Sequence, residues 1–199
     1  MKTFYTPFIL LFTAVLISSC QTESIHQEQS KNETLFTVSD AKVDFNLTRN
    51  IFEGCLDVAL MAGQHHEAGS ILAETIGDDL VITYLAAEGW TIDATHMSIG
   101  ICTEQWVPLT GSDNPKIGRF DHDSVHPDGT NEVTYTFPLA ELTEDFCFAT
   151  HAEVTSPEGV GETAWGSGIE FDGNSWAMYV DALLVDCDGD GGGDDPVVK

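Results

Sequence analysis

Apolar residues alternate with polar or small residues at a period of two through much of the chain, and this alternation constrains the fold more than any other feature. Residues 133–137 alternate large apolar side chains with Thr, and residues 146–154 present one apolar face. Such alternation is typical of half-buried strands, and continuous apolar runs are typical of covered ones. The other segments with strand composition are 56–61, 69–75, 80–85, 91–102 and 176–185.

Clusters of Gly, Asp, Asn and Pro separate these segments, as turn residues do in antiparallel sheets. Seven or eight strands at this spacing predict an all-β fold, an antiparallel β-sandwich. Only residues 139–145 are compatible with a helical turn, and residues 80–85 read as a strand covered on both sides. The brief alternation at 34–38 and 42–47 is compatible with a first edge strand or an extended lead-in.

The charge of the chain excludes two classes of partner. Seven Lys and Arg residues against 33 Asp and Glu residues give a net charge of -26. A chain this acidic repels phosphate backbones and anionic membrane surfaces, so we expect no nucleic-acid partner. Cations and basic partners remain, and a length of 199 residues favours one folded domain.

The N-terminal segment indicates export. Residues 4–17 are almost entirely apolar, but the run is too short to cross a hydrocarbon layer of ~30 Å. The Ile17-Ser18-Ser19-Cys20 sequence that ends it resembles the bacterial lipoprotein signal, which implies acylation of Cys20 and attachment to the membrane through that lipid. Gln21 after the cysteine favours the outer membrane within this resemblance. Cleavage by the ordinary signal peptidase, with Cys20 incidental, is the alternative.

The composition divides the chain into four parts. We expect a lipoprotein signal peptide at 1–19 and a lipidated N-terminus with a tether at 20–49, because residues 21–34 carry a single apolar side chain. The β-sandwich domain is expected at 50–187. A flexible acidic tail rich in Gly and Asp is expected at 188–199.

Four cysteines follow Cys20, and their even number in an exported chain favours two disulfides, for which three connectivities exist. Cys55 and Cys187 flank the folded part, so we predict that they pair and that Cys102 pairs with Cys147. Four free buried thiols are the alternative. A zinc site is less favoured, because no two cysteines have the close spacing of zinc ligands.

The C-terminal segment contains a weak calcium motif. Asp186, Asp188 and Asp190 alternate before Gly191, as at the start of a calcium loop. Position twelve of such a loop would be Val197 rather than a bidentate Glu, and a solvated acidic tail explains the same residues. Weakly bound calcium is therefore left open, and no other cofactor is expected.

No catalytic residue is predicted, because the chain lacks a nucleophile elbow, a His-Glu-x-x-His segment and a phosphate loop. His96 and His151 lie on strand faces and could bind zinc or transfer protons with nearby carboxylates. The interpretation we favour is that both bond to loop backbone. The remaining polar candidates are histidines expected in solvated turns and three acidic residues: His65, His66, His122, His126, Glu153, Glu162 and Glu170.

Three segments carry a wider resemblance: Ala62-Gly63-Gln64, residues 114–120 (NPKIGRF) and residues 162–168 (ETAWGSG). Over about 50–187 the chain resembles a recurrent domain of bacterial exported and surface proteins, marked by AGQ, NPxIGxF and ETAWGxG. The resemblance implies an exported β-rich architecture, and because this domain carries no assigned activity or ligand, it lends no support to a catalytic function.

We therefore expect a lipid-anchored envelope protein with a non-catalytic interaction or structural module. The alternative is a carbohydrate-binding or carbohydrate-acting surface protein, since exposed aromatic rings stack on sugars and paired carboxylates hydrolyse glycosides. The tryptophans distinguish these hypotheses. Burial of most of Trp90, Trp106, Trp165 and Trp176 removes the sugar platform, whereas two in one groove beside Glu153 or Glu162 would supply it.

Overall fold

The computed structural model describes residues 37–42 and 55–184. Within them, eleven strands form an antiparallel sheet, and two short 3-10 helices, η1 (Ile117–Arg119) and η2 (Leu139–Glu141), lie in connections. The strands are β1 (Thr37–Ala41), β2 (Leu56–Ala62), β3 (His66–Ile76), β4 (Asp79–Ala86), β5 (Thr91–Gly100), β6 (His122–Val125), β7 (Glu132–Pro138), β8 (Asp145–Thr155), β9 (Gly161–Gly166), β10 (Ile169–Glu170) and β11 (Met178–Leu183). The predicted all-β antiparallel class is confirmed, with more strands than the seven or eight expected.

Several predicted features lie outside the described residues: the signal peptide at 1–19, Cys20, Cys187, the three aspartates of the calcium motif and the acidic tail. No helix among the described residues has the length and apolar character needed to cross a membrane. Strand β1 falls inside the segment that composition assigned to the tether, and it pairs with β7 from Thr37 opposite Thr136 to Ala41 opposite Glu132. It overlaps residues 34–38, whose alternation is compatible with a first edge strand, and all five of its residues are exposed.

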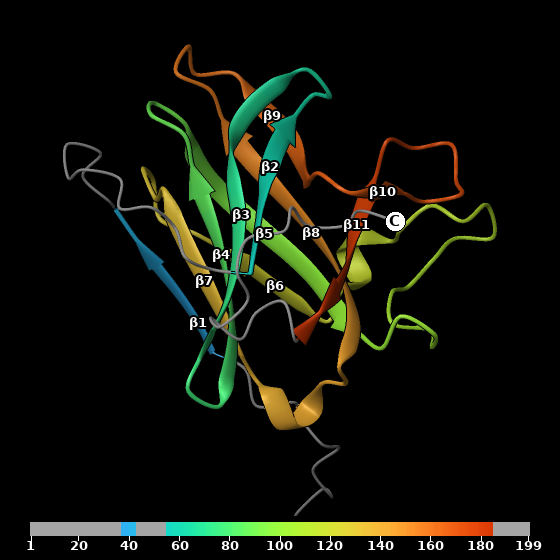
Figure 1. Cartoon of the computed structure of the whole chain (residues 1–199). Coiled ribbons are helices and arrows are strands. Elements are labelled where there is room, and N and C mark those ends of the chain that lie inside the picture. The colour runs from blue at the N-terminus through green and yellow to red at the C-terminus, as the bar shows by residue number, and fades with distance from the viewer. Residues whose placement is uncertain (1–36, 43–54, 185–199) are drawn as a thin grey trace, which may run out of the picture. The chain divides into compact units, whose positions relative to one another are not determined.

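The strands run in the order β1-β7-β4-β3-β2-β9-β8. Beyond β9, the same edge of β8 pairs with β11, which in turn pairs with β10. The other edge of β8 pairs with β5, which in turn pairs with β6. The sheet curls so that β7 faces β5 and β6 across the interior (Figure 1). The hydroxyls of Tyr135 on β7 and Thr95 on β5 are 2.8 Å apart, and the rings of Phe137 and His122 are 5.1 Å apart. The two halves of the sheet therefore pack as the layers of a sandwich.

The core contains the side chains that the period-two pattern directs inward. On β7 the buried positions are the apolar ones, and the intervening Thr residues are half-buried. The largest fully buried side chains come from both halves of the sheet and include Tyr84, Tyr135, Phe137, Phe146, Phe148, Leu60, Ile71 and Met97. Burying such side chains contributes about 1.5–3 kcal/mol each, which makes this interior the main source of stability.

Two glycine positions shape the β2–β3 hairpin. Its turn contains Gly63 and Gln64, with φ angles of +53° and +70°, the positive values that a tight hairpin turn requires. The pairing then shifts between Leu60 and Met61, where a bulge places Gly69 opposite Leu60. A Cβ at Gly69 would lie 2.0 Å from the carbonyl oxygen of Leu85. The close approach of β3 and β4 at this point thus requires glycine.

Candidate functional site

The outer face of β8 is covered by two segments, residues 101–121 and residues 167–177, which we call the outer cover. Residues 146–152 of β8 are all buried, so this strand is covered on both sides. The sequence pattern had predicted a strand covered on both sides at 80–85 and not here. Beneath the cover lies a second apolar cluster, separate from the main core: Val107, Phe120, Ala149, Trp165, Phe171 and Ala177.

The disulfide between Cys102 and Cys147 fastens the outer cover to β8, with a Cα–Cα distance of 4.9 Å. This pairing is the one predicted from the sequence. Cys55 is also disulfide-bonded. Its predicted partner, Cys187, lies outside the described residues, so that pairing stays a prediction.

The two segments of the cover are joined by the asparagine of the NPxIGxF segment. The Asn114 carboxamide oxygen accepts a hydrogen bond from the Ser175 backbone N–H at 2.8 Å, and a Cβ at Gly173 would lie 2.3 Å from that oxygen. At the end of the same segment, the ring of Phe120 packs edge-on against Trp165 of the ETAWGxG segment. Two of the segments that carry the sequence resemblance thus meet in the outer cover.

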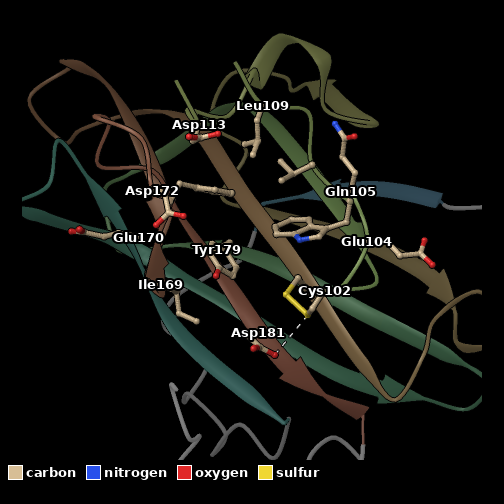
Figure 2. A pocket seen from close by; sticks show the side chains of 14 residues that line it. Cys102, Glu104, Gln105, Leu109, Asp113, Ile169, Glu170, Asp172, Tyr179 and Asp181 are labelled. Carbon is tan, nitrogen blue, oxygen red and sulfur yellow. Dashed lines mark hydrogen bonds between the residues drawn. A yellow bond between two sulfur atoms is a disulfide. The ribbon is translucent and has the colours of Figure 1, made fainter. Parts of the chain in front are cut away.

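A pocket of about 420 Å³ lies between the two segments of the cover (Figure 2). Its wall includes the disulfide, the end of β11 and the short strand β10. The lining residues are Cys102, Glu104, Gln105, Trp106, Val107, Leu109, Asp113, Cys147, Ile169, Glu170, Phe171, Asp172, Tyr179 and Asp181.

Three aromatic rings in the pocket contact one another. The Trp106 ring centre lies 5.6 Å from Tyr179 and 6.2 Å from Phe171, and Phe171 lies 4.9 Å from Tyr179. Trp106 and Tyr179 are half-buried, so part of each ring is open to a ligand. The faces of such rings carry negative electrostatic potential, which attracts cations and stacks against apolar groups.

Five exposed carboxylates surround these rings, and none of the fourteen lining residues is basic. Figure 2 shows Asp172 and Asp181 flanking Tyr179, with Asp181 next to the disulfide. Among the described residues, Cys102, Cys147 and Asp181 are the one group of three residues whose metal-ligand atoms all lie within 4.8 Å of one another. Both sulfurs belong to the disulfide, so this group cannot hold a metal by thiolate ligands in the oxidised protein.

A second candidate site lies on the outer faces of β5 and β8, where His96 and His151 are directly opposite each other in the strand pairing. Their Nδ1 atoms are 3.4 Å apart. The expectation that these rings bond to loop backbone is wrong, because their Nδ1 atoms face each other rather than a loop carbonyl. The error arises from register, which the sequence does not fix between strands 55 residues apart.

The two rings differ in environment. His151 is only 3% exposed, and its ring packs edge-on against Trp165 at 4.9 Å, whereas His96 is half-buried. Burial, together with repulsion from His96, lowers the pKa of His151 to about 4. His151 is therefore neutral at pH 7.

The low pKa of His151 predicts a loss of stability in mild acid. In the unfolded chain His151 takes up a proton near its ordinary pKa of about 6.5, whereas in the folded protein it stays neutral until about pH 4. The free energy of unfolding therefore falls as the pH is lowered between these two values. The shift corresponds to roughly 3 kcal/mol. Urea unfolding in metal-free buffer at pH 7 and pH 4 should show a loss smaller by about this amount in His151→Gln than in the wild type.

A matched His65→Gln variant controls for removing a histidine, since His65 is exposed in the hairpin turn. The comparison between variants cancels the titration of the many carboxylates. Equal pH dependence in His151→Gln and His65→Gln would contradict the prediction.

The other histidines in the described part of the chain form two pairs. His65 and His66 are exposed, as expected for turn residues. The same expectation is wrong for His122 and His126, which are buried because residues 122–125 form β6 and direct alternate side chains inward. Burial lowers the pKa of both. The His126 Nε2 atom lies 2.8 Å from the Thr95 hydroxyl, which also contacts Tyr135.

The acidic candidates do not form a pair beside the tryptophans. Glu153 is exposed on β8, Glu162 is half-buried on β9, and Glu170 lines the pocket. Trp165 is buried, while Trp90 and Trp176 pack against the two apolar clusters and Trp106 alone of the four lines the pocket. The pocket therefore lacks the pair of tryptophans beside Glu153 or Glu162 that would have favoured the carbohydrate alternative.

The pocket itself was missed by sequence reasoning, because its lining comes from three segments far apart in the chain. The interleaving of acidic and aromatic residues between Glu170 and Asp181 marks one of these segments but does not show that it meets the other two. No protein-family model, curated protein or solved structure matches the chain.

Proposed function

We propose that the chain is an exported lipoprotein held at the bacterial outer membrane through Cys20, and that its β domain is a non-catalytic interaction module. The pocket under the outer cover is the interaction site, and its ligand is a cationic group, such as a Lys or Arg side chain on a partner protein. The observation that carries this proposal is the composition of the pocket, in which five carboxylates surround three aromatic rings without a basic residue.

Electrostatics and geometry support this choice of ligand. An ammonium or guanidinium group in the pocket would form charge-assisted hydrogen bonds with carboxylates such as Asp172 or Asp181, and Tyr179 in the same lining offers a ring for a cation–π contact. A cation–π contact contributes about 0.5–1 kcal/mol at an exposed site and about 2 kcal/mol or more when it is shielded from water. The net charge of -26 would also speed the encounter with a basic partner at low salt.

Binding of lysine-rich and arginine-rich peptides to the exported protein tests the proposal. We expect Asp181→Asn and Trp106→Ala to weaken binding of an Arg-containing peptide by about 10-fold, and binding to weaken further as salt rises. Asp78→Asn, on the exposed β3–β4 turn outside the pocket, is the matched control and should bind like the wild type. Equal losses in Asp78→Asn and Asp181→Asn would mean that only the overall charge matters.

Carbohydrate binding is the second candidate, and the open faces of Trp106 and Tyr179 favour it. Sugars stack on such rings while their hydroxyls donate to carboxylates. A neutral glycan should bind with little dependence on salt, so a glycan array repeated at two ionic strengths separates the candidates. Glycan capture that Trp106→Ala abolishes and salt leaves unchanged would replace the cationic ligand with a sugar.

The anchoring part of the proposal has its own test. Cys20→Ser removes the thiol that would receive the diacylglycerol, and two or three acyl chains bury methylenes worth ~0.8 kcal/mol each. The variant should therefore move from the membrane fraction to the soluble fraction. Unchanged fractionation, together with a native mass that lacks acyl groups, would show that Cys20 is incidental.

A further inference from the structure

We propose that His96 and His151 form a transition-metal site on the outer face of β5 and β8, separate from the pocket, which takes Zn²⁺ or a similar cation. The two histidines are held by the pairing of adjacent strands, so the site is built into the sheet. Asp123 on β6 is opposite His96 in the strand pairing and supplies the third ligand once its side chain turns toward the two rings, and water completes the coordination.

The separation of the two nitrogens fits a metal better than it fits a hydrogen bond. The Nδ1 atoms are 3.4 Å apart, which is long for a hydrogen bond to a ring nitrogen. Two nitrogens, each about 2.0–2.1 Å from a tetrahedral zinc ion, lie about 3.4 Å apart. A cation can therefore bind both rings with little movement of either strand.

The strand register places a carboxylate next to this pair. Asp123 is opposite His96 across the β5–β6 pairing, and directly paired residues have Cβ atoms about 4.5–5.5 Å apart on the same face. Asp123 is exposed, so its side chain can change rotamer at little cost. Two imidazoles, one carboxylate and a water make up a common zinc ligand set.

Access and support of the site differ on its two sides. The ring of His151 is covered by Trp165, which fixes its position, whereas His96 is half-buried and leaves a route for the ion. The negative net charge of the chain raises the local concentration of divalent cations. His151 is thus a ligand held in place by apolar packing, and the side of the site at His96 is open to solvent.

Titration of the full-length, metal-stripped protein with Zn²⁺ tests the proposal, and Co²⁺ serves as a coloured substitute. We expect the wild type to bind one ion at this site and to show the visible absorption of tetrahedral Co²⁺. His96→Gln should weaken Zn²⁺ binding by at least about 10-fold, the lower end of what loss of a supporting partner costs. Asp123→Asn should weaken it less and change the Co²⁺ spectrum.

A double His65→Gln/His66→Gln variant is the matched control, because these histidines are exposed and lie outside the proposed site. It should retain the site, and the ion should quench Trp165 fluorescence when Cu²⁺ is used, since Trp165 packs against His151. His96 is half-buried, so its variant is expected to fold, and circular dichroism checks this independently of His151→Gln. Binding unchanged in folded His96→Gln, or lost only in the double variant, would overturn the proposal.

Discussion

Replacing Gly69 with alanine should destabilise the domain by more than about 4 kcal/mol, a cost that few single substitutions reach. The added Cβ would lie 2.0 Å from the carbonyl oxygen of Leu85 and 2.8 Å from the Cα of Ala86. Both are backbone atoms of the paired strand β4, so no side chain can move aside. The φ of +155° at Gly69 adds strain, because residues with a side chain rarely adopt it.

The effect is large because β3 is central to the sheet. Gly69 pairs with Leu60 on one side and Ala86 on the other, and both are fully buried or nearly so. Separating the strands there would open the core at its bulge. A domain whose total stability is about 5–15 kcal/mol loses much of its folded population after such a change.

Urea unfolding of the purified variant, or its yield on expression, measures the effect. Gly77→Ala is the matched control, because Gly77 has a φ of +64° but no atom within 4 Å of its added Cβ. It should cost only the strain of the left-handed conformation, about 1–2 kcal/mol. Similar losses in the two variants would show that backbone strain, and not the contact with β4, determines the result.

Removing the Cys102–Cys147 disulfide should cost about 4 kcal/mol, the second largest effect we expect. The two cysteines are 45 residues apart, so the cross-link removes much conformational freedom from the unfolded chain. Alanine at both positions avoids leaving a buried thiol at Cys147, which is 2% exposed. The double substitution also leaves the disulfide of Cys55 intact, which a reducing agent would not.

The double variant should also lose local order around the pocket and affinity for the peptide. The disulfide fastens the outer cover beside the pocket, so hydrogen exchange in residues 101–121 should become faster relative to β3 and β4. Peptide binding should weaken as well, because Asp181 lies next to the bond. If unfolding free energy fell by less than about 1 kcal/mol and exchange were unchanged, the cross-link would be redundant with packing.

The fold was largely predictable because burial follows side-chain size in the strands that carry the core. Residues 133–137 and 146–154 show this alternation, and both form strands. Strand β6 was missed because its inward positions hold polar groups, including His122, which looks solvated in sequence. Strand β1 is the first edge strand that the alternation at 34–38 and 42–47 allowed, but its bounds could not be predicted, because all of its side chains are exposed and its pairing with β7 defines it.

The candidate sites were predictable only in part. Alternation shows which face of its own strand each of His96 and His151 occupies. Whether the two residues lie opposite each other depends on the register between β5 and β8, which alternation does not show. The pocket depends on how Cys102, Phe171 and Asp181 converge, which no local pattern encodes. The pairing of Cys102 with Cys147 could be predicted, since the other two cysteines flank the domain.

The pairing of β1 with β7 sets an order of events during folding. Thr37 is synthesised early, yet its partner Thr136 lies about a hundred residues later in the chain. Loop closure over this separation is slow compared with formation of the hairpins, so β1 joins the sheet late. Until it does, the free backbone groups of β7 can pair with another chain. The backbone edge open to another chain is therefore that of β7 during folding and that of β1 in the finished sheet.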